Sequence, residues 1–212
     1  KAVDRIHLAI AENENIMIYG DYDVDGTTAV SLVYDYLRKR YDNIATYIPD
    51  RYKEGYGVSF AGIDFAEDNE ISLIIALDCG IKALEKVTYA KEKGIDFIIC
   101  DHHRPGETLP EAIAILDPKR GDCSYPYDEL CGCGVGFKLI QALGQKVGQG
   151  IDDFLPYLDL VATAIAADIV PLTGENRILS FFGLKVINQN PRPGIAALVH
   201  QVKKEILDIT DV

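Results

Sequence analysis

The strongest constraint on the fold is a repeated unit, in which a short apolar run ends at an acidic motif and a helical pattern follows. The apolar runs predict strands at Ile16–Tyr19, Ile44–Ile48, Ser72–Leu77, Phe97–Cys100 and Ala112–Leu116. Several are apolar almost throughout, which is typical of strands in a parallel sheet covered by helices on both faces. The sequence therefore predicts a doubly wound α/β fold with a mainly parallel sheet and right-handed crossovers.

Helical periodicity fills the segments between these strands and most of the chain after Pro126. The expected helices are Thr27–Arg40, Val58–Asp68, Lys82–Lys93, Gly136–Val147, Asp152–Ala166, Gly174–Asn188 and Gly194–Val202. We expect one domain over residues 1–212, with the sheet core over 1–125 and a mostly helical part over 126–212. Two arrangements of that part fit the pattern: a helical subdomain, or helices that close the ligand-binding edge of the sheet.

Acidic motifs follow three of the predicted strands directly. Asp21, Asp23 and Asp25 follow the first strand, Asp78 follows the third, and Asp101-His102-His103 follows the fourth. The carboxyl ends of parallel strands share one edge of the sheet, and ligands bind there in open α/β folds. The sequence therefore predicts that these motifs converge on one site.

The residue types at this edge point to metal ions. If the first motif is extended, Asp21, Asp23 and Asp25 point the same way and repel one another unless cations bind among them. One aspartate would serve as a helix cap, but three exceed that need. Imidazole beside carboxylates suits Mn, Fe or Zn better than Mg or Ca. The cluster therefore favours metal-dependent cleavage of phosphate esters.

Asp168 is a further candidate ligand, because it directly follows the apolar stretch Leu160–Ala167. A carboxylate at the end of a buried segment needs a partner. A metal ion is one such partner; a helix N-terminus or Arg177 is the alternative.

The overall composition limits the class of protein. The net charge is −12, with 33 acidic and 21 basic residues, which argues against a simple nucleic-acid-binding module. It does not exclude a metal-dependent nuclease, because divalent cations offset carboxylates. No apolar stretch is long enough for a membrane span, and there is no signal-peptide pattern. The odd count of five cysteines indicates reduced thiols in a cytoplasmic protein.

Other motifs leave two interpretations open. The glycines before Lys138 fit either a phosphate cradle, with Lys138 on the strand backbone, or a tight entry into a helix. Arg51 and Tyr56 fit phosphate binding and base stacking, although any surface loop can carry such residues. Structural zinc is disfavoured, because the cysteines form no Cys-x-x-Cys pair.

The ordered set of motifs resembles the DHH phosphoesterase superfamily and, within it, the RecJ-type single-strand-specific exonucleases. The matching segments are Gly20–Gly26, Ile48–Arg51, Glu54–Gly57, Asp78–Gly80, Asp101–His103, Leu116–Pro118, Gly132–Lys138 and Ala167–Leu172. The resemblance implies that residues 1–212 form a DHH catalytic domain. We expect a piece of a longer protein, because the family's accessory substrate-binding domains do not occur in this sequence.

The resemblance also implies roles for single residues. Two divalent metal ions, Mn²⁺ in the first place with Mg²⁺ as the alternative, would share Asp78 as a bridge. Asp23 would ligate one ion, and the other would be completed by Asp25, His102 and Asp168. His103 would bind the scissile phosphate or donate a proton, so that Asp78, His102 and His103 form the catalytic group, with Asp21 and Asp101 supporting them. Tyr19 replaces a histidine of the related pyrophosphatases, which argues against pyrophosphatase activity.

The activity implied is stepwise release of nucleotides from the 5′ end of single-stranded DNA. A single-strand-binding protein or a helicase would be the partner, and no membrane is involved. The alternatives are a phosphodiesterase of short oligoribonucleotides or cyclic dinucleotides, and a catalytically inactive replication scaffold. The loops argue against the first and the filled ligand positions against the second. We expect this fragment to bind Mn²⁺ but to digest DNA poorly by itself.

Overall fold

The computed structural model describes residues 1–201, 204 and 206–211, and in them five strands form one wholly parallel sheet. The strand order is β2-β1-β3-β4-β5. The strands are β1 (Asn15–Gly20), β2 (Ile44–Tyr47), β3 (Ile71–Leu77), β4 (Asp96–Cys100) and β5 (Ala114–Leu116). The predicted α/β fold and its parallel sheet are confirmed, and each predicted strand is present with its ends shifted by at most two residues.

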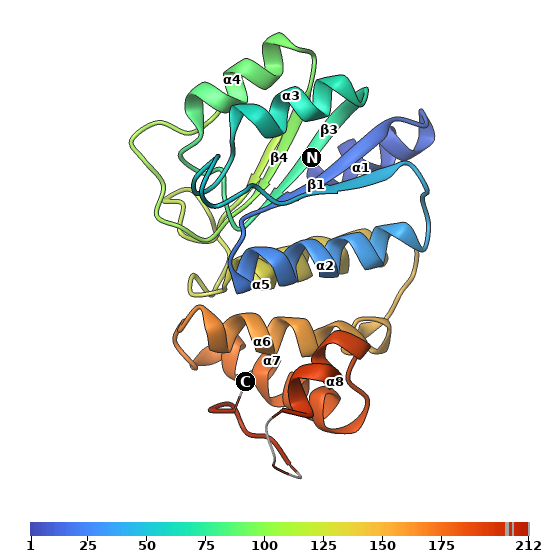
Figure 1. Cartoon of the computed structure of the whole chain (residues 1–212), viewed down its shortest axis with the longest axis vertical. Helices are drawn as coiled ribbons and strands as arrows, with labels where there is room; N and C mark the ends of the chain where they lie inside the picture. Colours follow the sequence, from blue (N-terminus) through green and yellow to red (C-terminus); the bar gives the residue numbers. More distant parts are fainter. Residues whose placement is uncertain (202–203, 205, 212) are drawn as a thin grey trace.

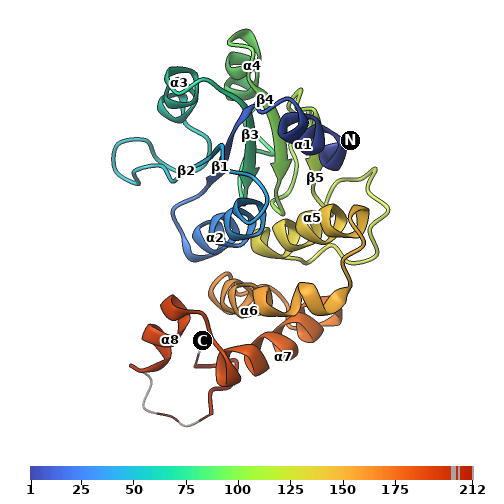
Figure 2. The same cartoon turned by 90° about the vertical axis from the view of Figure 1, so that its right-hand side faces the viewer.

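Helices cover both faces of this sheet, as Figures 1 and 2 show. The helices are α1 (Ala2–Ala11), α2 (Val24–Arg38), α3 (Phe60–Asp68), α4 (Leu84–Glu92), α5 (Gly132–Lys146), α6 (Leu158–Ala167), α7 (Gly174–Gln189) and α8 (Pro193–Val199). One apolar core joins α1, α2 and α5 to the sheet, and a second joins α3 and α4 to its other face. Helix α6 packs on α2 and α5, and α7 packs on α6, so a third layer lies beyond α2 and α5.

Several helix boundaries differ from the prediction. Helix α1 was not predicted, although Ala2, Ile6 and Ala9 are buried at helical spacing. The expected helix Asp152–Ala166 begins with two short 3₁₀ turns and becomes α-helical at Leu158, because Pro156 interrupts the hydrogen-bond ladder. Helix α8 ends at Val199, and the expected end at Val202 lies outside the described residues.

A buried ion pair fixes the third layer. Asp159 in α6 is 1% exposed, and its Oδ2 lies 2.8 Å from Nε of Arg192, the residue before α8. This pair also fixes the position of α6, the helix that ends at Asp168. No described helix combines the length and the apolar character required to cross a lipid bilayer.

Candidate metal centre

The acidic motifs meet where the strand order of the sheet reverses. From β1 the chain continues to β2 on one side of the sheet, and from β3 it continues to β4 and β5 on the other side. Asp21 directly follows β1, and Asp78 directly follows β3. The crevice beyond the carboxyl ends of two such strands is the usual ligand site in doubly wound sheets. The predicted convergence at one edge is therefore confirmed.

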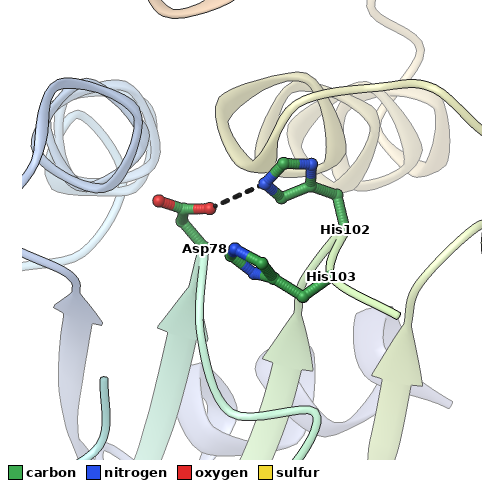
Figure 3. Close-up of side chains that lie close together, drawn as sticks. All are labelled: Asp78, His102 and His103. Atoms are coloured by element: carbon green, nitrogen blue, oxygen red, sulfur yellow. Dashed lines mark ion pairs between the residues drawn. The ribbon is translucent and has the colours of Figure 1, made fainter. Parts of the chain in front are cut away.

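Three carboxylates from separate segments surround one nitrogen atom of His102. His102 Nε2 lies 3.1 Å from Asp78 Oδ1, 3.6 Å from Asp168 Oδ2 and 3.7 Å from Asp25 Oδ2. Figure 3 shows His102 and His103 beyond the end of one strand, both close to Asp78 on the neighbouring strand. Asp25, His102 and Asp168 form one group with ligand atoms within 4.8 Å of one another, and Asp78, His102 and His103 form another.

The hydrogen bonding of these side chains fits a bound cation. Asp78 Oδ1 and both ring nitrogens of His102 are buried without a hydrogen-bond partner among the described residues. Asp78 Oδ1 and His102 Nε2 approach to 3.1 Å without hydrogen-bond geometry. Buried polar atoms are rarely left unsatisfied, because each one costs about 1–3 kcal/mol. Carboxylate oxygens and imidazole nitrogens are also ligands that Mn²⁺ accepts.

The electrostatics of the cluster point the same way. Burial raises the pKa of Asp78, and the nearby carboxylates of Asp25 and Asp23 raise it further. Burial and the charge of Asp168 also raise the pKa of Asp25. Burial lowers the pKa of His102 to about 4, so its ring is neutral at pH 7 and free to act as a ligand. A divalent cation would stabilise the charged carboxylates that the protein alone disfavours.

The glycine-rich stretch supports this cluster through its backbone. Backbone N–H groups of Gly132 and Cys133, at the start of α5, donate to the two carboxylate oxygens of Asp25 at 2.6 and 2.7 Å. A Cβ on Gly132 would lie only 2.5 Å from the Cβ of Asp78. The stretch is therefore a tight entry into a helix, and its first amides hold Asp25 in place.

The first acidic motif does not stay extended, so the condition under which its three carboxylates would point the same way is not met. Helix α2 begins at Val24, within the motif, and the Asp23 carboxylate caps it by accepting a hydrogen bond from Gly26 N at 2.9 Å. Asp21 is fully buried and accepts a hydrogen bond from Gly57 N at 2.9 Å. Asp25 enters the cluster from the first turn of α2, while Asp23 belongs to neither of the two groups of close ligand atoms.

Asp101 holds the second histidine in place. Its Oδ1 lies 2.7 Å from His103 Nδ1 and accepts hydrogen bonds from the backbone N–H groups of His102 and His103, while Oδ2 accepts one from Ile81 N. The hydrogen bond to Asp101 raises the pKa of His103. Burial alone would raise the pKa of Asp101, but the contacts with His103 outweigh it and lower that pKa. His103 Nε2 faces the crevice, 3.1 Å from the hydroxyl of Tyr56.

Residues 15–165 match the family described as "DHH family, N-terminal domain". The chain belongs to the DHH family. The single-stranded-DNA-specific exonuclease RecJ of Bacillus subtilis strain 168 is 45% identical over 199 residues, covering 94% of this chain and 25% of that protein. The enzyme of the same name from Escherichia coli strain K12 is 38% identical over 216 residues, covering 97% of this chain and 37% of that protein. The chain thus spans about a quarter to two fifths of these curated relatives.

Solved structures agree with this assignment. A crystal structure of exonuclease RecJ bound to manganese superposes with a TM-score of 0.86 at 31% identity, covering 95% of this chain and 51% of the other. RecJ from Thermus thermophilus in complex with Mn²⁺ superposes with a TM-score of 0.81 at 28% identity, covering 95% of this chain and 29% of the other. The family resemblance expected from the motifs is confirmed.

A row of aromatic side chains lies beside the group of Asp25, Asp78, His102 and Asp168. It includes Tyr22, which the sequence motifs did not single out. The Tyr22 ring lies edge-on to Tyr56, with centroids 6.1 Å apart, and the Arg51 guanidinium carbon is 5.2 Å from the Tyr22 ring centre. Tyr56 in turn contacts His103 edge-on. The position of Tyr22 between Asp21 and Asp23 in the sequence was the signal that could have identified it.

The Lys138 ammonium is engaged by other side chains of the protein and is not available to a substrate in this conformation. It forms an ion pair with Glu175 and donates a hydrogen bond to Gln141 at 3.0 Å. Asp168 lies beside His102, and the described residues show no ion pair between it and Arg177.

Backbone strain lies next to Asp168. Ile169 has φ +55° and is 88% exposed, and a β-branched residue rarely adopts this left-handed conformation. We expect Ile169→Gly to raise the free energy of unfolding by about 1 kcal/mol, because it removes strain and little packing. Urea unfolding of both proteins without metal measures this. Ile178→Gly, a change within α7 at a residue 58% exposed, is the control and should destabilise; destabilisation by Ile169→Gly as well would contradict the strain.

Proposed function

We propose that this chain is the catalytic core of a RecJ-type exonuclease, which hydrolyses single-stranded DNA to nucleotides from the 5′ end with two divalent metal ions. The observation that carries the proposal is the convergence of Asp25, Asp78 and Asp168 on His102 Nε2, with Asp78 Oδ1 and both His102 ring nitrogens buried without hydrogen-bond partners among the described residues. The curated relatives named as single-stranded-DNA-specific exonucleases support the substrate. In this proposal residues 1–212 form the DHH catalytic domain, with 1–125 as its sheet core and 126–212 as the helical part that supplies Asp168.

One group of close ligand atoms, Asp25, His102 and Asp168, supports the first metal site, and the family supports the roles of Asp78 and Asp23. Asp25, His102 and Asp168 would hold one ion, Asp78 would bridge, and Asp23 would serve the other with the carboxylate oxygen that does not cap α2. When bound, the ions would supply a hydroxide at neutral pH and neutralise the phosphoryl oxygens. Mn²⁺ fits the mixed oxygen and nitrogen ligands better than Mg²⁺ does, and structures described as RecJ complexes exist with both ions.

The remaining residues bind and orient the substrate. His103, held by Asp101, would place Nε2 against the scissile phosphate, where it binds an oxygen or gives a proton to the leaving group. Tyr22, Tyr56 and Arg51 would contact bases and phosphate along the strand. Lys138 would reach the strand only after leaving Glu175. A single-strand-binding protein or a helicase would deliver the substrate, in the cytoplasm, where the five free cysteines stay reduced.

The test uses the full-length protein with end-labelled single- and double-stranded DNA and Mn²⁺. We expect nucleotide release from the single strand, starting at the 5′ end, and loss of this activity when EDTA removes the metal. Equal attack on both substrates would contradict the proposal. So would activity confined to a cyclic dinucleotide, which would instead support the phosphodiesterase alternative.

A further inference from the structure

A cavity lies beside His103, next to the start of α4. It has a volume of about 260 Å³ and is bounded by the loop after β3 and by the loop that precedes α3. Its walls include Tyr56, Gly57, Gly80, Lys82, Lys86 and His103. His103 and Tyr56 thus lie between the candidate metal site and this cavity. We call the cavity the lysine pocket.

The charge of the lysine pocket is opposite to that of the chain as a whole. The chain carries a net charge of −12, yet within the part that the structure describes neither Lys82 nor Lys86 forms an ion pair. Lys91 and Lys93, farther along the same segment, are paired with Glu111 and with Asp64 and Glu67 respectively. Two lysines without a protein anion on the walls of one cavity indicate a site for an anionic ligand.

The surroundings leave these two cations available. The Lys86 ammonium lies 5.5 Å from the centre of the Phe60 ring, a contact that does not neutralise its charge. Asp101 lines the same cavity, but it is 1% exposed and its oxygens are engaged by His103 and three backbone N–H groups. Lys82 and Lys86 therefore line the cavity without a competing exposed carboxylate on its walls.

We propose that the lysine pocket binds a phosphate group of the nucleic-acid strand that adjoins the scissile phosphate. The proposal rests on the proposed function, because it takes the scissile phosphate to lie between the metal cluster and His103. A strand in that position places its neighbouring phosphate on the other side of His103, where Lys82 and Lys86 lie. A cavity of this size holds a phosphate with part of a sugar, and it is smaller than the pockets that enclose whole ligands.

The experiment compares two double variants of the full-length protein. Lys82→Ala/Lys86→Ala removes the two pocket cations, and Lys91→Ala/Lys146→Ala removes the same charge from two lysines paired with Glu111 and Asp4 away from the pocket. Hydrolysis of single-stranded DNA is followed over a range of substrate and salt concentrations, and Mn²⁺ affinity is measured by calorimetry.

For the pocket variant we expect KM to rise about 100-fold with kcat and Mn²⁺ affinity unchanged, since each charged contact contributes about tenfold. The slope of log KM against log salt should fall by about 0.7, as expected for one phosphate contact on a single strand. The control variant should stay within about twofold of the wild type. A pocket variant that matches the control, or one that loses kcat and Mn²⁺ affinity at unchanged KM, would overturn the proposal.

Two further arms separate the outcomes. A defect seen only with a 5′-phosphorylated strand assigns the pocket to the terminal phosphate, and a defect seen equally with a 5′-hydroxyl strand assigns it to an internal phosphodiester. Thymidine 3′,5′-bisphosphate, titrated while the side-chain NMR signals of Lys82 and Lys86 are recorded, tests the pocket without catalysis. Shifts of these signals in a wild type that does not cut DNA would refute the proposed function and keep the pocket; unshifted signals would overturn the pocket.

Discussion

Asp78→Asn is expected to make the metal-free protein more stable while it abolishes Mn²⁺ binding and nuclease activity. The Asp78 side chain is almost fully buried, and Oδ1 has no hydrogen-bond partner among the described residues. Because burial and the neighbouring carboxylates raise the pKa of Asp78, this carboxyl must take up a proton when the metal-free protein folds at pH 8, and asparagine removes that cost of about 2 kcal/mol. Loss of a bridging ligand should reduce activity about 10³-fold or more.

The backbone makes asparagine the right substitution. Asp78 has φ +59°, a left-handed conformation that asparagine adopts readily and alanine does not. Asp78→Ala should therefore lose metal binding equally but be about 1 kcal/mol less stable than Asp78→Asn. The comparison separates the effect of the charge from the effect of the backbone.

The pH dependence gives the sign of the charge effect. Burial and the neighbouring carboxylates raise the pKa of Asp78 in the folded protein above its value of about 4 in the unfolded chain. A group of this kind contributes stability that is full below the unfolded-state pKa and is lost as the pH rises through the folded-state pKa. We therefore expect metal-free wild type to lose stability as the pH rises from about 5 to about 8, and Asp78→Asn to lose less.

Urea unfolding at both pH values, with EDTA and then with Mn²⁺, measures these effects, and calorimetry gives the metal affinity. Mn²⁺ should restore the stability of the wild type at pH 8 and leave the variant unchanged. Two bound Mn²⁺ ions in Asp78→Asn would show that Asp78 does not bridge.

Gly132→Ala is expected to disrupt the same site from the opposite side. Its Cβ would lie 2.5 Å from the Cβ and 2.8 Å from the Cα of Asp78, atoms that cannot move away without shifting β3. The displaced start of α5 would also withdraw the amides of Gly132 and Cys133 from Asp25. We expect the free energy of unfolding to fall by about 3 kcal/mol. We also expect the variant to lose Mn²⁺ binding.

Gly134→Ala is the matched control, two residues farther along the same helix. Its Cβ would meet only the Leu130 side chain and the Cys131 sulfur, at 3.4 Å or more. Alanine favours a helix over glycine by up to about 1 kcal/mol, so this variant should be as stable as the wild type or more stable. Thermal unfolding and Mn²⁺ calorimetry of both variants check the pair; wild-type Mn²⁺ affinity in Gly132→Ala would contradict the close approach to Asp78.

The sequence predicted well those features that depend on local pattern. The strands are apolar almost throughout, so their number, order along the chain and parallel pairing followed from pattern and connection length. The motifs after β1, β3 and β4 share an edge because the carboxyl ends of all parallel strands do. Helix starts were predicted less well: α2 and α5 both begin inside motifs in which aspartates or glycines concealed the helical periodicity.

By itself, the sequence determined the α/β fold, the convergence of the acidic motifs and the family, since each depends on residue types at fixed positions along the chain. The tertiary structure decided what each side chain touches. It showed that the backbone amides of Gly132 and Cys133, in the first turn of α5, hold Asp25, and that Asp23 caps α2. It also placed Lys82 and Lys86 beside His103, although 16 or more residues separate them in the sequence. Such contacts depend on how the loops beyond the sheet pack together, and the pattern of a single sequence does not contain that information.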